Sequence, residues 1–67
     1  MIAISLNGES KQLAAETTVV QLLQQLGYAG KRVAVEKNGE IVPKSQHALV
    51  RIAQGDRLEI VVAVGGG

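Results

Sequence analysis

Residues 58–67 read LEIVVAVGGG, an alternating apolar pattern that runs directly into three glycines. Alternation with a period of two is typical of a β-strand that has one buried face. The inner phase is formed by Leu58, Ile60, Val62 and Val64. Val61 and Ala63 remain on the outer phase beside the glycines. We predict that these two side chains contact a partner protein, because exposed apolar patches mark interfaces.

The glycine tail is narrow and has a long reach. Glycine has no Cβ, so the backbone of Gly65 and Gly66 can enter a slot that excludes any side chain. At the extended limit, residues 65–67 carry the carboxylate of Gly67 roughly 10 Å beyond the folded body. We therefore expect a folded domain over residues 1–64 and a flexible tail over 65–67 that reaches into a partner's active site. A glycine tail is also compatible with an inert end, and the tail alone does not decide between the two interpretations.

The composition excludes several classes of protein. A chain of 67 residues forms one small domain, and we expect no deep internal pocket in it. The absence of Cys excludes disulfides and thiolate metal sites and fits a reducing compartment. Seven Lys and Arg residues are dispersed among six Asp and Glu residues, which disfavours nucleic-acid binding. No apolar run approaches the ~20 residues that span a bilayer, and no secretion signal is present, so we expect a cytoplasmic protein without membrane binding.

The sequence begins with the pattern of a β-hairpin. Apolar residues occupy every second position from Ile2 to Leu6, which predicts a strand. The dipeptide Asn7-Gly8 follows, and both residues tolerate the positive φ angles of a tight turn. We therefore expect a second, antiparallel strand around residues 10–13.

A short helix follows the hairpin. Thr18 and Gln21 have the spacing of a capping box, in which each side chain satisfies a backbone N–H of the other. One apolar stripe with helical spacing is formed by Val19, Leu22, Leu23 and Leu26. Gly27 can adopt the left-handed conformation that ends many helices. The pattern predicts two to three helical turns whose stripe packs in the core.

The middle of the sequence is less regular. Val33 and Val35 restart the strand pattern, and Asn38-Gly39 predicts a second tight hairpin. Pro43 cannot donate a ladder hydrogen bond, so the strand before it is short or lies at a sheet edge. We interpret residues 45–47 as a helical turn and residues 49–52 as a short strand.

These elements predict an α+β fold of the β-grasp type. One helix stripe must cover the apolar face of one sheet, so we expect a mixed sheet of four to five strands with one main helix on one face. The first and last strands have the strongest alternation, and the connection between them is long enough for parallel pairing. We therefore expect these two strands to lie side by side.

The chain resembles the ubiquitin-like sulfur carriers over almost its whole length, and most closely those of the thiamin pathway. The resemblance is carried by Thr18-Val19 followed by Leu22-Leu23, by residues 33–35, by the segment from Asn38 to Pro43, by Gly55-Asp56 and by the terminal glycines. It implies that Gly67 is adenylated by a ubiquitin-activating-type enzyme and converted to a thiocarboxylate. It also implies that a sulfur-donor protein supplies the sulfur and that thiazole synthase receives it.

A carrier of this kind is not itself an enzyme. A carboxylate is a poor electrophile and must be activated before sulfur can attack it, which requires ATP and Mg²⁺. The sequence contains neither the G-x-x-x-x-G-K-[ST] nor the G-x-G-x-x-G motif, and it has no acid cluster with metal-ligand spacing. We therefore expect no cofactor or metal on this chain and assign ATP and Mg²⁺ to the adenylating partner.

Other polar and aromatic residues are assigned ordinary roles. His47 is the only histidine, but no Cys or recognisable triad accompanies it, so we expect an ordinary surface or loop position. Tyr28 is expected to pack in a loop. We interpret as solvated charges the side chains of Glu36, Lys37, Glu40, Asp56, Arg57 and Glu59.

Two alternatives remain open from the sequence. The first is another ubiquitin-like sulfur carrier, such as the small subunit of molybdopterin synthase, which has the same fold and terminal glycines but is usually longer. The second is a non-catalytic β-grasp interaction module with an inert tail.

Overall fold

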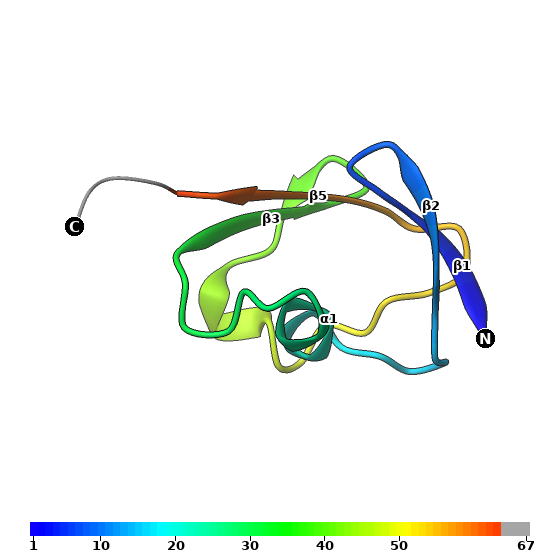
Figure 1. Ribbon diagram of the computed structural model, residues 1–67, viewed down its shortest axis with the longest axis horizontal. Helices are drawn as coiled ribbons and strands as arrows, with labels where there is room; N and C mark the ends of the chain where they lie inside the picture. The colour runs from blue at the N-terminus through cyan, green and yellow to red at the C-terminus, as the bar shows by residue number, and fades with distance from the viewer. Residues whose placement is uncertain (64–67) are drawn as a thin grey trace.

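The computed structural model describes residues 1–63, which form a five-stranded sheet with a helix against one face (Figure 1). The strands are β1 (Ile2–Leu6), β2 (Glu9–Leu13), β3 (Val33–Lys37), β4 (Glu40–Ile41) and β5 (Arg57–Val62). Their order across the sheet is β2-β1-β5-β3-β4, with β1 and β5 parallel and the other pairs antiparallel. The mixed sheet and the parallel pairing of the first and last strands confirm the prediction of a β-grasp.

Both Asn-Gly turns hold the central strand β5. Asn7 and Asn38 have φ angles of 50° and 55°, as tight hairpin turns require. The side-chain amide of Asn7 donates to the carbonyl of Ile60 at 3.1 Å and accepts from its N–H at 2.8 Å. Asn38 Oδ1 accepts from the N–H of Arg57 at 2.9 Å. Each turn residue therefore extends the pairing of its own hairpin onto β5.

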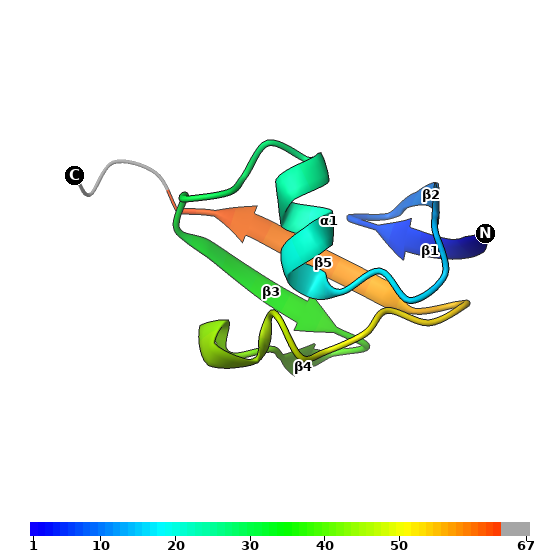
Figure 2. The ribbon, with the colours of Figure 1, turned by 90° about the horizontal axis from the view of Figure 1, so that it is seen from below.

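The helix α1 (Val19–Gln25) begins with the predicted capping box. Thr18 Oγ1 accepts from the N–H of Gln21 at 3.3 Å, and Gln21 Oε1 accepts from the N–H of Thr18 at 2.9 Å. α1 crosses the inner face of the sheet over β5 (Figure 2). Its buried stripe packs with apolar residues from every strand except β4. The buried core consists of Ile4, Leu13, Val19, Leu22, Leu23, Val35, Val42, Ile52, Leu58 and Ile60.

The helix ends in a Schellman motif, in which two residues beyond the last turn donate back to its carbonyls. Gly27, with a φ angle of 78°, donates to Gln24 at 3.1 Å, and Tyr28 donates to Leu23 at 2.8 Å. The motif turns the chain back toward β3 and sets Tyr28 against the core, where it is half-buried. The expected loop packing of Tyr28 is therefore confirmed.

The segment between β4 and β5 differs from the prediction. The helical turn is present as the 3₁₀ helix η1 (Lys44–Gln46), but residues 49–52 form only an isolated bridge between Arg51 and Thr18. The carbonyls of this segment instead satisfy the first N–H groups of α1. Val19 donates to Val50 at 3.0 Å and Val20 donates to His47 at 2.9 Å. The demand of a helix N-terminus for acceptors explains why these residues do not join the sheet.

His47 lies in the turn that follows η1, as a loop position requires, but it is buried, which corrects the expectation of a surface residue. Its side chain is 6% exposed, and Nε2 lies 3.0 Å from the carbonyl oxygen of Val42. Because a carbonyl can only accept, Nε2 carries the hydrogen. His47 thus joins η1 to the core through its ring and to α1 through its backbone carbonyl.

Asp56 is also buried, at 8% exposure, rather than solvated. Its carboxylate accepts from the N–H of Ala53 at 2.8 Å and from Asn38 Nδ2 at 3.0 Å, and Lys37 Nζ lies 3.6 Å away. Burial alone raises the pKa of this carboxyl group, but the hydrogen bonds from Ala53 and Asn38 and the charge of Lys37 outweigh it. The pKa of Asp56 is therefore lowered from 3.8.

The lowered pKa predicts that Asp56 links stability to pH. A carboxyl whose pKa is lower in the folded state contributes stability above its unfolded pKa and loses it as pH falls through the folded value. We expect Asp56→Asn to destabilise the fold by about 1–3 kcal/mol at pH 7, because asparagine keeps only one acceptor oxygen, so either the N–H of Ala53 or Nδ2 of Asn38 loses its partner. The variant should also lose less stability than the parent between pH 7 and pH 2.

Urea unfolding at a series of pH values measures both effects. Glu9→Gln removes an equal charge from an exposed position and serves as the control. Parallel stability profiles for the parent chain and Asp56→Asn would contradict the role given to this carboxylate.

Candidate functional site

The end of β5 is held in place by the neighbouring strand β3. Beyond β5, the N–H of Ala63 donates to the carbonyl of Arg32 at 2.9 Å, so the last described residue is tied to the start of β3. This end of β5 lies at the opposite end of the molecule from the N-terminus (Figure 1). The predicted reactive residue Gly67 and the predicted tail residues Gly65 and Gly66 lie outside the described residues.

The two predicted contact residues share an exposed apolar patch on the outer face of the sheet. Val61 is 65% exposed, and Ala63 is exposed two positions further along. Ala34 of β3 lies directly opposite Val61 and is also exposed. We call Ala34, Val61 and Ala63 the outer patch. The sequence did not reveal Ala34, because its place beside Val61 depends on the register between β3 and β5.

Two carboxylates border the outer patch. Glu36 of β3 and Glu59 of β5 are direct cross-strand partners, an arrangement that destabilises a sheet when both are charged. Within residues 1–63 the two ion pairs join Lys37 to Asp56 and Arg51 to Glu16, so neither of these glutamates takes part in one. Ile41 of β4, which is 65% exposed, lies on the other side of Glu36. The outer face therefore offers apolar side chains next to unpaired negative charge.

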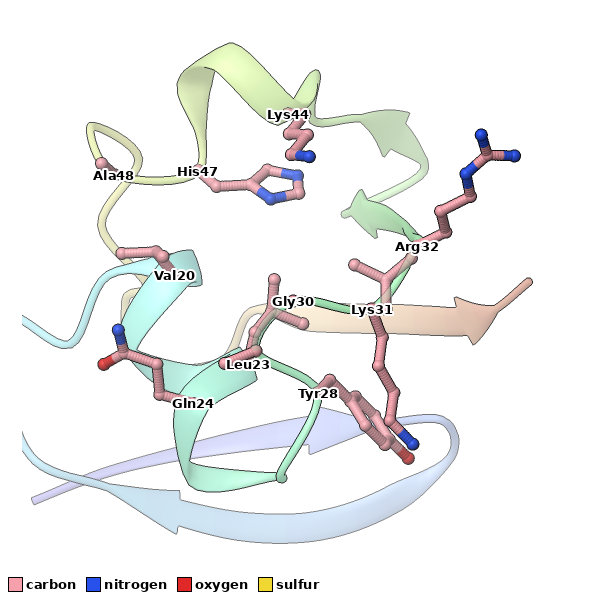
Figure 3. A pocket seen from close by; sticks show the side chains of 12 residues that line it. Val20, Leu23, Gln24, Tyr28, Gly30, Lys31, Arg32, Lys44, His47 and Ala48 are labelled. Carbon is pink, nitrogen blue, oxygen red and sulfur yellow. The ribbon is translucent and has the colours of Figure 1, made fainter. Parts of the chain in front are cut away.

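The inner side of the molecule contains a surface cavity of about 660 Å³ (Figure 3). It lies between α1, the loop that joins α1 to β3, and the segment 44–48. The sequence predicted no deep internal pocket, and this cavity is of another kind, because it forms where three separate segments meet at the surface. Its walls include the buried ring of His47.

Residues 1–63 contain neither a cluster of metal ligands nor a membrane-spanning helix. No three His, Asp or Glu side chains gather there in a way that could hold a metal ion. No helix within residues 1–63 is long and apolar enough to cross a membrane.

Comparison with known proteins adds to this geometry. The family model of the ThiS family matches residues 4–67. The chain is 37% identical to the sulfur carrier protein ThiS of Bacillus subtilis over 65 residues, which cover 96% of this chain and 98% of that protein. The crystal structure of the thiamine biosynthesis protein ThiS of Geobacter metallireducens superposes with a TM-score of 0.83 at 29% identity, covering 98% of this chain and 100% of that one.

A different kind of relative is a longer protein. The chain is 52% identical over 62 residues, 92% of its length, to the thiazole synthase of Paramagnetospirillum magneticum. It spans only 19% of that protein and 20% of a second thiazole synthase, from Magnetococcus marinus.

The family match covers almost the whole chain, and the fold agrees with that of a solved member. Proteins of this family are small sulfur carriers rather than catalytic enzymes. The chain belongs to the ThiS family.

Proposed function

We propose that this chain carries sulfur as a thiocarboxylate on Gly67 and donates it to thiazole formation in thiamin biosynthesis. The observation that carries the proposal is the position of β5: the central strand of a ThiS-family fold leads directly from the outer patch toward the glycines. A reactive end attached to the most firmly paired strand has a defined starting point, which limits the positions that the end can reach.

The chemistry requires activation by a partner. A carboxylate oxygen of Gly67 attacks the α-phosphorus of ATP and expels pyrophosphate, which gives an acyl-adenylate. Hydrosulfide delivered by a sulfur-donor protein then attacks the acyl carbon and displaces AMP, and the thiocarboxylate remains. Mg²⁺ offsets the charge of the phosphates during the first step. A ubiquitin-activating-type adenylating enzyme supplies the nucleotide and metal sites, and this chain supplies the acyl group.

The outer patch is the proposed docking surface for the adenylating enzyme. Val61 and Ala63 lie immediately before the tail, so a partner that covers them also holds the start of the tail. The opposed carboxylates of Glu36 and Glu59 favour a partner that presents Lys or Arg beside an apolar surface. Such cations would relieve the repulsion between the two glutamates on binding.

Thiazole synthase is the proposed recipient of the sulfur. Two proteins named thiazole synthase contain a segment similar to this chain within a polypeptide about five times as long. A covalent link between two domains raises their effective concentration and suits a carrier that acts repeatedly on one enzyme. We therefore propose an enzyme of the same type as the recipient of sulfur from this chain.

The first prediction from this proposal concerns Val61. We expect Val61→Asp to raise the KM for adenylation by about tenfold or more, because it buries a third carboxylate beside Glu36 and Glu59 in the interface. Val61→Thr keeps the branched shape and strand propensity and should have a smaller effect. Pyrophosphate release at limiting adenylating enzyme measures both variants.

Leu49→Asp is the matched control, because Leu49 is 70% exposed and lies outside the outer patch. It should leave the KM unchanged. Equal effects of Val61→Asp and Leu49→Asp would rule out the outer patch as the docking surface.

A second prediction concerns the width of the tail. Gly66→Val should abolish thiocarboxylate formation, because a branched Cβ blocks a narrow slot and restricts the backbone angles available there. The melting temperature should not change, since residue 66 follows the last strand in the sequence and lies outside its alternating apolar pattern. Whole-protein mass after incubation with ATP, the adenylating enzyme and a sulfur source measures the yield. A normal yield would mean that the partner has no narrow slot.

A third prediction tests the reactive atom itself. One residue added after Gly67 converts its carboxylate to an amide and moves the free acid outward by up to ~3.3–3.6 Å. Activation needs the reacting atoms held at about 3–3.5 Å and aligned, so the extended chain should fold normally and form neither adenylate nor thiocarboxylate. Proteolytic removal of the added residue should restore both products.

Circular dichroism and thermal melting of the extended chain are the controls for folding. The mass of the C-terminal peptide of the natural protein establishes whether Gly67 ends the chain in the cell. Sulfur transfer to the extended chain at the parent rate would show that the carboxylate of Gly67 is not the carrier group.

A further inference from the structure

The cavity on the inner side has an apolar floor with firmly held walls. Leu23 of α1 and Val33 of β3 line it, and Tyr28 closes one end (Figure 3). The Schellman hydrogen bond from Tyr28 to Leu23 sets one wall, and the bond from Val20 to the carbonyl of His47 sets the other. These two bonds tie the walls of the cavity to the two ends of the same helix.

The charge around the cavity is one-sided. Three of the seven Lys and Arg residues line it, namely Lys31, Arg32 and Lys44, and none of the six Asp and Glu residues does. Within residues 1–63 the ion pairs use other cations, so these three are not neutralised there. The net charge of the whole chain is only +1, so the positive potential is local to this site.

Lys44 and His47 form a polar pair at the cavity. A 3₁₀ helix has three residues per turn, so side chains at positions i and i+3 lie on the same side. The N–H of His47 donates to the carbonyl of Lys44 at 3.1 Å and closes this turn. Both side chains extend from η1 toward the open space above α1 (Figure 3). The N–H at Nε2 of His47 is used by the bond to Val42, so Nδ1 of the neutral ring can only accept, and Lys44 is the member of the pair that can donate to an anion.

We propose that this cavity binds a small organic anion, with the apolar body of the ligand on Leu23 and Tyr28 and its acidic group beside Lys44. Its volume of about 660 Å³ is in the range of small-molecule sites, about 300–1,000 Å³. Apolar lining with a few convergent polar groups is typical of such sites. The inference goes beyond sulfur transfer and does not depend on it, because the cavity and the outer patch lie on opposite faces of the sheet.

The probe for the test is 8-anilino-1-naphthalenesulfonate, an aromatic sulfonate whose fluorescence rises in an apolar site. We expect saturable binding to the folded chain at one site. Amide shifts in ¹H–¹⁵N NMR spectra should centre on Tyr28, His47 and Ala48. N-phenyl-1-naphthylamine has the same rings without the sulfonate and should bind about tenfold more weakly.

Variants distinguish binding of the probe in the cavity from nonspecific binding elsewhere on the surface. Lys44→Gln should raise the Kd of the sulfonate by about tenfold and leave the Kd of the neutral probe unchanged. Arg57→Gln removes the same charge from an exposed position on β5 outside the cavity and should change neither value. Ala48→Phe adds a ring at the rim of the cavity and should weaken binding of both probes, with thermal melts as the control for folding.

Four results would overturn the proposal. Shifts centred on Val61 would assign the probe to the outer patch. Equal Kd values for the two probes would show that charge does not contribute to binding. Equal Kd values of the sulfonate for the parent and Lys44→Gln would show the same. Naphthalene-1-sulfonate and a short peptide of Asp, Glu and Leu are compared as competitors of the bound sulfonate. If the peptide displaces the probe at the lower concentration, the site is a binding surface for acidic proteins.

Discussion

Pairing of β5 with a hairpin on each of its edges is the constraint on which the rest of the structure depends. β5 joins the pair β1 and β2 to the pair β3 and β4, and neither two-stranded unit buries enough apolar surface to persist alone. The amide side chains of Asn7 and Asn38 reinforce both junctions. Only the joined sheet presents an apolar face wide enough for the stripe of α1, so the helix, the cavity walls and the outer patch all follow from this one strand.

The sheet separates two surfaces of opposite character. On the outer side, the apolar patch around Val61 lies next to the carboxylates of Glu36 and Glu59. On the inner side, the cavity combines apolar walls with unneutralised cations such as Lys44. The two surfaces adjoin at Arg32, which lines the cavity and whose carbonyl accepts from the N–H of Ala63 in the outer patch.

The sequence predicted those features that depend on neighbouring residues. The capping box of Thr18, the turns at Asn7 and Asn38 and the outward phase of Val61 each follow from spacing within a few positions, and each is present. His47 and Asp56 were misjudged because burial depends on distant partners, namely the carbonyl of Val42 and the N–H of Ala53. Val50 and Ile52 have strand-like alternation, but the helix N-terminus takes the acceptors of that segment. The cavity could not be predicted, since its three walls meet only after the fold has formed.

The bonds between Asn7 and Ile60 have a kinetic consequence. These residues are 53 positions apart, and their pairing closes a loop that contains most of the chain. Contacts of such high sequence separation have a large loop-closure entropy and form late, which slows the folding of β-rich domains relative to helical bundles. During synthesis the first hairpin, the helix and the second hairpin leave the ribosome before their common neighbour β5 is available. Stable tertiary structure therefore arises only after almost all of the 67 residues have emerged, and a nascent chain interrupted before residue 57 remains unfolded and open to proteolysis.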